Sequence, residues 1–381
     1  MNFLVEGVNF TNKGAELMLH AVKQQIHGWD DENTISLHLR IGNFKQRTDV
    51  EVSHLLWLRF GKIPFATPSF NIIANLTPKN IRERYNFILE SEIDVVLDAS
   101  GFCFSDQWGA RATEEKLKLY SRWKKQGKKI ILLPQAFGPF SSDKIQQAFR
   151  KVVEISDLVF ARDRISFEHI NKFNNPKNNI RIAPDFTNLV EGVEPPYFNT
   201  LLGRPCIIPN QRMIDKTSLN VGDNYLSSLA SIAEYLIEKG LDPFILIHEK
   251  DDCILGKELQ NSIAKNITVV EEDNSLFLKS ILGKCSFVVS SRFHGLVSAL
   301  SQGVPCIGTG WSHKYEMLFQ DYNCLELLID SNNINNVLEK LDLLICEATR
   351  TKIIHDLEIS GSNLKALSKV MWSEVQQIIN V

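Results

Sequence analysis

Residues 288–310 read VVSSRFHGLVSALSQGVPCIGTG, and this stretch decides the fold class that we expect for the chain. An apolar run ends at Ser290, a helical pattern starts near Phe293, and a second apolar run covers Val304–Ile307. Two apolar strands joined by a helix form a βαβ unit, in which the strands are parallel and buried on both faces. The stretch therefore predicts an α/β fold built on a parallel sheet.

The same alternation of strand and helix extends through the whole chain. We expect strands at Phe3–Val8, Asp94–Leu97, Lys129–Leu133, Leu158–Ala161, Ile180–Ala183, Cys206–Ile208, Phe244–Ile247, Phe287–Ser290 and Val304–Ile307. Pro134 should end the third of these strands, because proline donates no hydrogen bond to a sheet. The pattern predicts two doubly wound domains, one in each half of the chain.

The stretch 190–205, VEGVEPPYFNTLLGRP, breaks the periodicity with two adjacent prolines and is the best candidate for a linker. We therefore place an N-terminal domain at 1–192 and a C-terminal domain at 203–360. The last residues, 361–381, have an amphipathic pattern and are expected to form a helix. This helix could belong to either half, and one possibility is that it packs back on the N-terminal domain.

Composition excludes several classes of protein. The chain has 381 residues, too many for one ordinary domain, with 44% hydrophobic and 23% charged residues and a net charge of −3. A disordered chain and a nucleic-acid binder that relies on a global basic field are both disfavoured. The seven cysteines have no CxxC spacing, and the first residues lack a signal-peptide pattern, so we expect reduced thiols and a cytoplasmic protein.

Residues 55–76, LLWLRFGKIPFATPSFNIIANL, are apolar and aromatic but follow neither a strand nor a helix pattern. One interpretation is a buried loop or helical hairpin packed on the first domain. The other is an interfacial patch that contacts a membrane or a lipid-linked substrate. The second interpretation would place the protein at the inner face of the cytoplasmic membrane.

The ligand site of a parallel α/β sheet lies beyond the carboxyl ends of its strands. Here those ends carry small and polar residues, in NFTNKG, DASGF, PQAFGP, RDRIS and APDF. Arg292 and His294 follow a strand and start a helix, where free N–H groups and the helix dipole favour an anion. Arg292 would add a cation and His294 a group that exchanges protons near neutral pH. Pairing of Arg292 with an acidic neighbour and packing of His294 are the structural alternative.

Other polar residues follow other strands. Arg162, in ARDRIS, is a second candidate anion ligand that could meet Arg292 across a cleft between the domains, or it could pair with Asp163 or another carboxylate. His248 precedes Glu249, Asp251 and Asp252, a cluster that could bind a sugar. Metal-ligand spacing such as HExxH is absent, so no metal is expected.

Three further residues complete the candidate set. Lys13 follows the first strand in a turn that has neither a dinucleotide nor a P-loop pattern, and could equally be solvated. Lys314 follows a later strand and could be an exposed lysine. Gln135 ends the strand that reads LPQAFGPF.

Several segments together resemble the polysaccharide pyruvyltransferase family. They are NFTNKGAE (9–16), LPQAFGPF (133–140), ARDRIS (161–166), APD (183–185), PNQRMIDK (209–216) and SRFHGLVSALSQGVPCIG (291–308), followed by Lys314. They occur in the family's order. One departure is DASGF, which stands where the family usually has a glycine-rich turn, so no contact is transferred to Asp98 or Ser100.

The resemblance implies two Rossmann-like domains that face each other across a cleft, as in the GT-B glycosyltransferases. It implies phosphoenolpyruvate as donor, a sugar with two free hydroxyls as acceptor, and no cofactor, in exopolysaccharide or capsule synthesis. By similarity, Arg162, Arg292, His294 and Lys314 would bind phosphoenolpyruvate, and Arg292 and His294 would be catalytic. The remaining candidates are assigned to the acceptor, lipid-linked or soluble, or to the cleft: Asn9, Asn12, Lys13, Gln135 and His248.

Two alternatives stay open. A glycosyltransferase of the same fold would use a nucleotide sugar, and Glu316 is the one carboxylate in a suggestive position for the nucleotide. A catalytically idle protein could instead serve as a scaffold for polysaccharide assembly.

Overall fold

The computed structural model describes residues 1–56, 74–173, 177–215, 219–310, 312–329 and 334–380. Within them the chain divides into two compact units. Unit 1 comprises Met1–Phe10, Met18–Asp185 and Lys369–Val381, and unit 2 comprises Thr11–Leu17 and Phe186–Ser368. Most of the aromatic stretch 55–76 lies outside the described residues, and so does Lys216.

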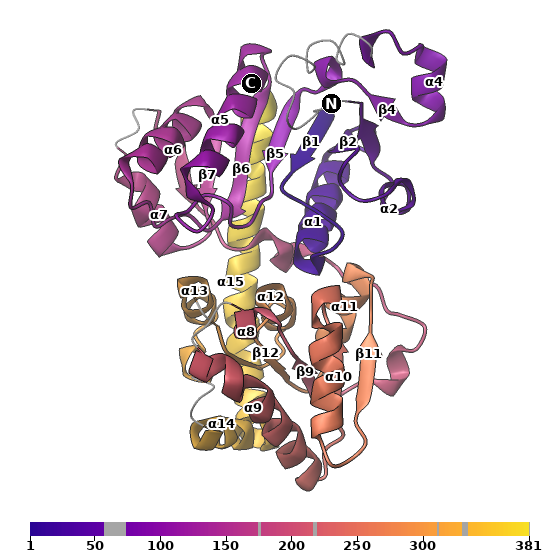
Figure 1. The fold of residues 1–381 in the computed structure, drawn as a ribbon, viewed down its shortest axis with the longest axis vertical. Coiled ribbons are helices and arrows are strands. Elements are labelled where there is room, and N and C mark those ends of the chain that lie inside the picture. Colours follow the sequence, from indigo (N-terminus) through magenta and orange to yellow (C-terminus); the bar gives the residue numbers. More distant parts are fainter. Residues whose placement is uncertain (57–73, 174–176, 216–218, 311, 330–333, 381) are drawn as a thin grey trace. The chain divides into compact units, whose positions relative to one another are not determined.

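Unit 1 is built on an eight-stranded sheet in the order β4-β3-β2-β1-β5-β6-β7-β8, in which every pair of neighbours is parallel. Its strands are β1 (Asn2–Glu6), β2 (Thr34–His38), β3 (Ser53–Leu55), β4 (Phe87–Ile88), β5 (Val95–Asp98), β6 (Lys129–Gln135), β7 (Leu158–Ala161) and β8 (Ile180–Ile182). Its helices are α1 (Lys13–Trp29, whose first turn belongs to unit 2), α2 (Phe44–Asp49), α4 (Lys79–Arg84), α5 (Gly109–Lys125), α6 (Asp143–Ile155) and α7 (Arg164–Asn171) (Figure 1).

Unit 2 is built on a five-stranded parallel sheet in the order β11-β10-β9-β12-β13. Its strands are β9 (Cys206–Ile208), β10 (Phe244–Ile247), β11 (Thr268–Glu271), β12 (Val288–Ser290) and β13 (Cys306–Gly308). Its helices are α8 (Arg212–Asp215), α9 (Leu219–Glu238), α10 (Cys253–Ser262), α11 (Ser275–Leu282), α12 (Phe293–Leu300), α13 (His313–Asp321), α14 (Ile334–Ile345) and the larger part of α15 (Glu347–Asn380) (Figure 1).

Both orders run outward from a central strand in two directions, which is the doubly wound topology that the sequence predicts. The expectation of two Rossmann-like α/β domains is thus confirmed. The central strands are completely buried: Leu4, Val96 and Leu132 in unit 1, and Ile207 and Val288 in unit 2, have no exposed surface. Burial of both faces explains why these strands read as continuous apolar runs.

The end of β6 and the start of the last helix differ from the sequence-based expectation. Strand β6 continues through Pro134 to Gln135, because the pairing of β6 with β7 shifts register between Leu132 and Gln135 and no ladder bond is needed from the proline. The last helix begins at Glu347, well before residue 361, and runs through Gly361. A Cβ on Gly361 would meet no atom closer than 3.7 Å, so nothing is packed tightly against this glycine.

Candidate functional site

The turn between β12 and α12 is fixed by hydrogen bonds from two other segments of unit 2 and by one bond within the turn. The amide of Asn210 donates to the carbonyl oxygen of Ser291 at 2.6 Å, and the hydroxyl of Tyr315 donates to the same oxygen at 2.9 Å. Ser290 Oγ accepts the backbone N–H of Arg292 at 2.9 Å. Arg292 is therefore held at the N-cap position of α12, where the sequence predicts it.

Arg292 is 7% exposed and lies between two carboxylates from the carboxyl end of β10. Its Nε donates to Asp252 Oδ2 at 2.8 Å, and its Nη2 donates to the other oxygen of Asp252. Its Nη1 donates to Glu249 Oε2 at 2.5 Å. Of the two interpretations of Arg292 that the sequence left open, the pairing with acidic neighbours is the one present in the structure.

Glu249 and Asp252 differ in how firmly they are held. Asp252 also accepts the backbone N–H of Gln211 at 2.9 Å, so both of its oxygens are used. Burial raises the pKa of Glu249, the neighbouring Arg292 opposes this, and Asp252 adds to the rise. Glu249 therefore takes up a proton more readily than an ordinary glutamate, and its protonation would weaken the contact with the guanidinium.

The start of α1 brings a second cation to unit 2. Lys13 is 3% exposed, and its ammonium lies 2.8 Å from Glu16 Oε2 and 2.8 Å from Asp273 Oδ1. Burial lowers the pKa of Lys13, but the bonds to Asp273 and Glu16 outweigh it, so the pKa is raised. Lys13 is thus an ion-paired group and not a solvated one. Asn12 is exposed and its Oδ1 accepts the N–H of Ala15 at 3.0 Å, within the first turn of α1.

His294 lies directly against this turn of α1. A Cβ built on Gly14 would be 2.1 Å from Nδ1 of His294, so only glycine allows this approach. The edge of the Phe293 ring faces the His294 ring, with centroids 5.4 Å apart. The ammonium of Lys314 lies 5.3 Å from the centroid of Phe293 and 5.3 Å from that of Tyr315. Lys314 therefore contacts the aromatic neighbours of His294 through cation–π interactions.

His248 follows β10 and is 4% exposed, and its buried Nδ1 has no hydrogen-bond partner in the described part of the chain. Burial, followed by the charges of Arg292, His294 and Lys13, lowers the pKa of His248 to about 3. The imidazole is therefore neutral at physiological pH. A buried imidazole nitrogen without a partner is costly, and a ligand that supplies the missing bond would relieve this cost.

The structure thus brings together five of the predicted residues in unit 2: Lys13, His248, Arg292, His294 and Lys314. Glu316, the carboxylate considered for a nucleotide, is exposed and accepts a bond from Gln320 at 3.3 Å. Sequence reasoning missed Asp273, which follows β11, a strand that the pattern also missed.

Asn9, Gln135 and Arg162 lie in unit 1. Arg162 is 6% exposed, and its Nη1 donates to Asp185 Oδ2 at 3.2 Å. The neighbouring Asp163 has another task, because it caps α7 by accepting the N–H of Ser166 at 2.7 Å. Gln135 is fully buried, its Oε1 accepts the thiol of Cys103 at 3.5 Å, and its Nε2 has no partner among the described groups.

The DASGF turn of unit 1 carries a buried charge cluster that sequence reasoning did not assign. Lys116 donates to Asp98 Oδ2 at 2.6 Å and to Ser100 Oγ at 3.0 Å, and Tyr120 donates to Asp98 as well. Asp98 has no exposed surface, yet Lys116 and the hydrogen bonds of the turn overcome the effect of burial and lower its pKa. The aspartate in this turn therefore anchors α5 to the end of β5.

Metal-binding clusters and membrane-spanning helices are both absent from the described residues. No group of three or more His, Cys, Asp or Glu side chains in them is placed to hold a metal ion. None of the helices they form is both long enough and apolar enough to span a bilayer.

Comparisons with known proteins agree with this architecture. The polysaccharide pyruvyl transferase family model matches residues 12–313. The chain is similar in structure to a UDP-GlcNAc 2-epimerase from Neisseria meningitidis bound to UDP-GlcNAc, with a TM-score of 0.59 at 11% identity over 99% of this chain and 100% of that one. It is also similar to HepE from Anabaena in complex with UDP and glucose, with a TM-score of 0.57 at 11% identity over 100% and 99% of the two chains.

A third similar structure is the spinosyn rhamnosyltransferase SpnG complexed with spinosyn aglycone, with a TM-score of 0.53 at 11% identity over 97% of this chain and 100% of that one. At these identities the likeness concerns the fold alone, which is the GT-B fold.

Proposed function

The chain belongs to the polysaccharide pyruvyl transferase family, and we propose that it transfers the enolpyruvyl group of phosphoenolpyruvate to a sugar. Two hydroxyls of the sugar form a cyclic pyruvate ketal, and phosphate is released. The product would enter a surface polysaccharide such as an exopolysaccharide or a capsule. The observation that carries this proposal is the convergence of Lys13, His248, Arg292 and His294 at the starts of α1 and α12.

Phosphoenolpyruvate carries a phosphate and a carboxylate, so its site needs several cations and hydrogen-bond donors. Lys13, Arg292 and Lys314 supply cations in unit 2, and the first N–H groups of α12 add partial positive charge. We assign Arg162 of unit 1 to the same donor molecule, and Asn9, Asn12 and Gln135 to the acceptor or the cleft. Both assignments rest on the family resemblance and on the position of these residues after their strands.

The proposed reaction starts with a proton added to the methylene carbon of the enol, which makes the neighbouring carbon electrophilic. A sugar hydroxyl adds to that carbon and loses its proton. The C–O bond to phosphate then breaks, and a second hydroxyl adds and loses its proton to close the ketal. His294 moves a proton in this scheme, either to the methylene carbon or to the departing phosphate. His248, neutral and without a partner, donates or accepts a hydrogen bond from the bound substrate.

Arg292 must change partners for this function. An anion that reaches its guanidinium competes with Glu249, whose carboxylate repels the anion unless it takes up a proton. Asp252 keeps two bonds to Arg292 and fixes the plane of the guanidinium. We therefore propose that donor binding replaces the Glu249 contact and leaves the Asp252 contact in place.

One alternative is favoured by a specific observation. HepE was solved with UDP and glucose, and SpnG is a rhamnosyltransferase, so a nucleotide-sugar transferase with this fold is the second candidate. It predicts release of a nucleotide, whereas the pyruvyl transferase reaction releases inorganic phosphate.

The direct test is phosphate release from phosphoenolpyruvate in the presence of a panel of sugar acceptors. We expect His294→Ala and Arg292→Ala to lower turnover by about 100-fold or more, because each removes a group that acts in the transition state. The matched controls are His355→Ala and Arg164→Ala, which change exposed side chains of the same types. Near-normal turnover in both site variants would exclude the assignment.

The cytoplasmic location and a lipid-linked acceptor at the membrane surface are also proposals. The location rests on the expectation of reduced cysteines, and the lipid-linked acceptor rests on the composition of residues 55–76, most of which lie outside the described structure. Replacement of Trp57, Phe60 and Phe65 by serine should abolish vesicle binding and lower activity on a lipid-linked acceptor. Unchanged vesicle binding and activity would contradict this part of the proposal.

A further inference from the structure

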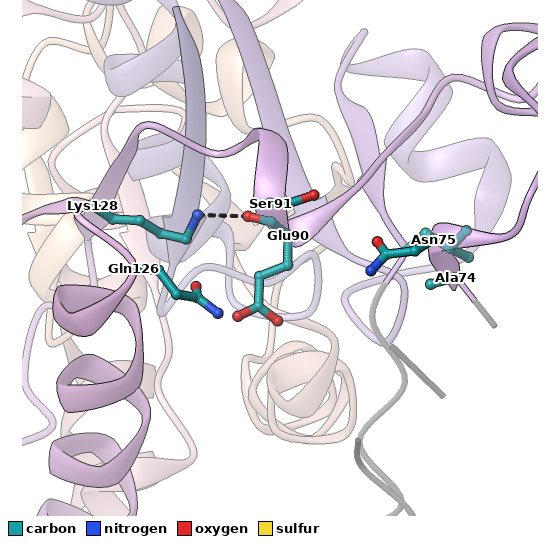
Figure 2. Close-up of a pocket in the computed structure, with 7 residues that line it drawn as sticks. Ala74, Asn75, Glu90, Ser91, Gln126 and Lys128 are labelled. Carbon is teal, nitrogen blue, oxygen red and sulfur yellow. Dashed lines mark hydrogen bonds between the residues drawn. The ribbon is translucent and has the colours of Figure 1, made fainter. Parts of the chain in front are cut away.

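Unit 1 contains a cavity with polar and apolar walls, and none of the candidate site residues lines it. Its volume is about 410 Å³, and its walls include Ala74, Asn75, Glu90, Ser91, Gln126 and Lys128 (Figure 2). Glu90 and Ser91 precede β5, Gln126 follows α5, and Lys128 precedes β6. One wall of the cavity, at Lys128, therefore lies at the amino end of β6, whereas Gln135 lies at the carboxyl end of the same strand; Leu56, which follows β3, forms another wall.

Glu90 gives this cavity a buried acceptor. The side chain is 8% exposed, and its Oε2 accepts Arg122 Nη2 at 2.6 Å. Its Oε1 is shielded from solvent and has no hydrogen-bond partner in the part of the chain that is described. Buried carboxylate oxygens are almost always satisfied in proteins, so this oxygen calls for a donor that the described residues do not supply.

Lys128 and Gln126 give the cavity donors. The ammonium of Lys128 is 3% exposed and donates to the backbone carbonyls of Glu90 at 2.6 Å and Ile93 at 2.8 Å, the first of which is drawn in Figure 2. An ammonium has three protons, so one is left for another acceptor. The amides of Gln126 and Asn75 and the hydroxyl of Ser91 line the same space and both donate and accept.

This mixture of charges limits the chemistry of an occupant. An anion would face the carboxylate of Glu90, and a cation would face the ammonium of Lys128. A neutral ligand with several hydroxyls avoids both conflicts, because each hydroxyl donates one hydrogen bond and accepts others. The volume is within the usual range for a small-molecule site.

We propose that this cavity binds a neutral sugar residue, at a subsite separate from the one where the ketal forms. Glu90 Oε1 accepts a sugar hydroxyl, and Lys128 and Gln126 donate to others. Sugar binding here is independent of the donor chemistry. The further statement that the sugar belongs to the acceptor glycan rests on the proposed function. A glycan that reached from the amino end to the carboxyl end of β6 would have to cover the length of this strand. Seven residues of strand span roughly 20 Å, which is longer than one sugar residue, so such a glycan would have to be an oligosaccharide.

The test is saturation-transfer difference NMR of the full chain with D-glucose, D-galactose, D-mannose and their disaccharides at millimolar concentrations. Two variants alter the cavity through exposed wall residues: Ser91→Trp fills it, and Gln126→Ala removes an amide. Gln147→Ala, on an exposed face of α6, is the matched control.

We expect saturation transfer to at least one sugar in the wild type and the control, and a loss of about tenfold or more in affinity for both cavity variants. Stabilisation by phosphoenolpyruvate should be unchanged in all four proteins, which separates this proposal from the proposed function. The proposal would be overturned if the wild type showed no saturation transfer to any sugar. It would also be overturned if Ser91→Trp and Gln126→Ala showed the same saturation transfer as the wild type.

Discussion

Gly14 and His294 touch at a point where no side chain fits between them. A Cβ on Gly14 would lie 2.1 Å from Nδ1 and 2.5 Å from Cγ of the His294 ring. The imidazole therefore rests on the first turn of α1, next to Lys13. This contact explains why a glycine follows the lysine in the NFTNKGAE segment, a position that the sequence alone presents only as a turn residue.

The first prediction concerns this contact. Gly14→Ala should displace His294 and lower turnover at least about tenfold, because a small misplacement of a catalytic group has a large effect. Gly28→Ala is the matched control in the same helix, where nothing lies within 4 Å of the new Cβ. The control should keep full activity and gain up to about 1 kcal/mol of stability. Equal activity of the two variants would show that the position of His294 is not critical.

The second prediction concerns the pH dependence of donor binding. Burial raises the pKa of Glu249, and binding of phosphoenolpyruvate in place of the carboxylate favours the protonated form further. Affinity for phosphoenolpyruvate should therefore rise as pH falls toward this pKa, with net uptake of protons measurable by calorimetry in buffers of different ionisation enthalpy.

Glu249→Gln isolates this effect from the titration of the ligand itself. The variant should bind phosphoenolpyruvate more tightly at neutral pH and lose the extra proton uptake. Glu168→Gln, which changes an exposed partner of Arg164, is the control and should behave as the wild type. A weaker binding of phosphoenolpyruvate by Glu249→Gln at neutral pH would contradict the proposed exchange of partners.

The third prediction concerns stability at low pH. The pKa of His248 is about 3 in the folded chain, below the ordinary value of 6.5, so the unfolded chain binds more protons between these two values. His248 therefore lowers the free energy of unfolding as pH falls below about 6.5, by up to about 1.4 kcal/mol per pH unit. In urea titrations at pH 7 and pH 5, His248→Leu should lose less stability between the two pH values than the wild type. Parallel losses would exclude a neutral, buried His248.

The fourth prediction concerns the Asp98–Lys116 pair. Lys116→Met leaves the fully buried Asp98 without its cation, which should cost about 3–5 kcal/mol in the free energy of unfolding. Adding Asp98→Asn should recover a large part of this loss, because no buried charge then remains. If the double variant is as unstable as the sum of the single ones, the two residues do not act as a pair.

Much of the fold could be predicted from the sequence, and the exceptions have physical reasons. Strands β7, β9 and β10 have the predicted bounds, since each is a short apolar run buried on both faces. Strands β2, β3, β4 and β11 were not predicted. β3 and β4 have only three and two residues, and β11 is a partly exposed edge strand, so their pairing depends on neighbours that are distant in sequence.

The candidate site was predictable in its residues but not in its pairings. Lys13, His248 and Arg292 follow strands or start helices, and that local signal singles them out. Their carboxylate partners cannot be assigned locally: Asp273 meets Lys13 from the far half of the chain, and Glu249 reaches Arg292 from the end of β10, which β9 separates from β12 in the sheet. The sequence also offered no sign that Asp185 would pair with Arg162 while Asp163 caps a helix.

The most direct test of the central claim is a thermal shift measurement with phosphoenolpyruvate, run beside a set of UDP-sugars. At about a hundredfold excess over Kd, specific binding adds about 2.7 kcal/mol to the free energy of unfolding, which gives a clear rise in Tm. We predict that phosphoenolpyruvate stabilises the chain and that this stabilisation is lost in Arg292→Ala and Arg162→Ala but kept in Arg164→Ala. Stabilisation by a UDP-sugar alone, with no response to phosphoenolpyruvate, would contradict the account and favour a nucleotide-sugar transferase.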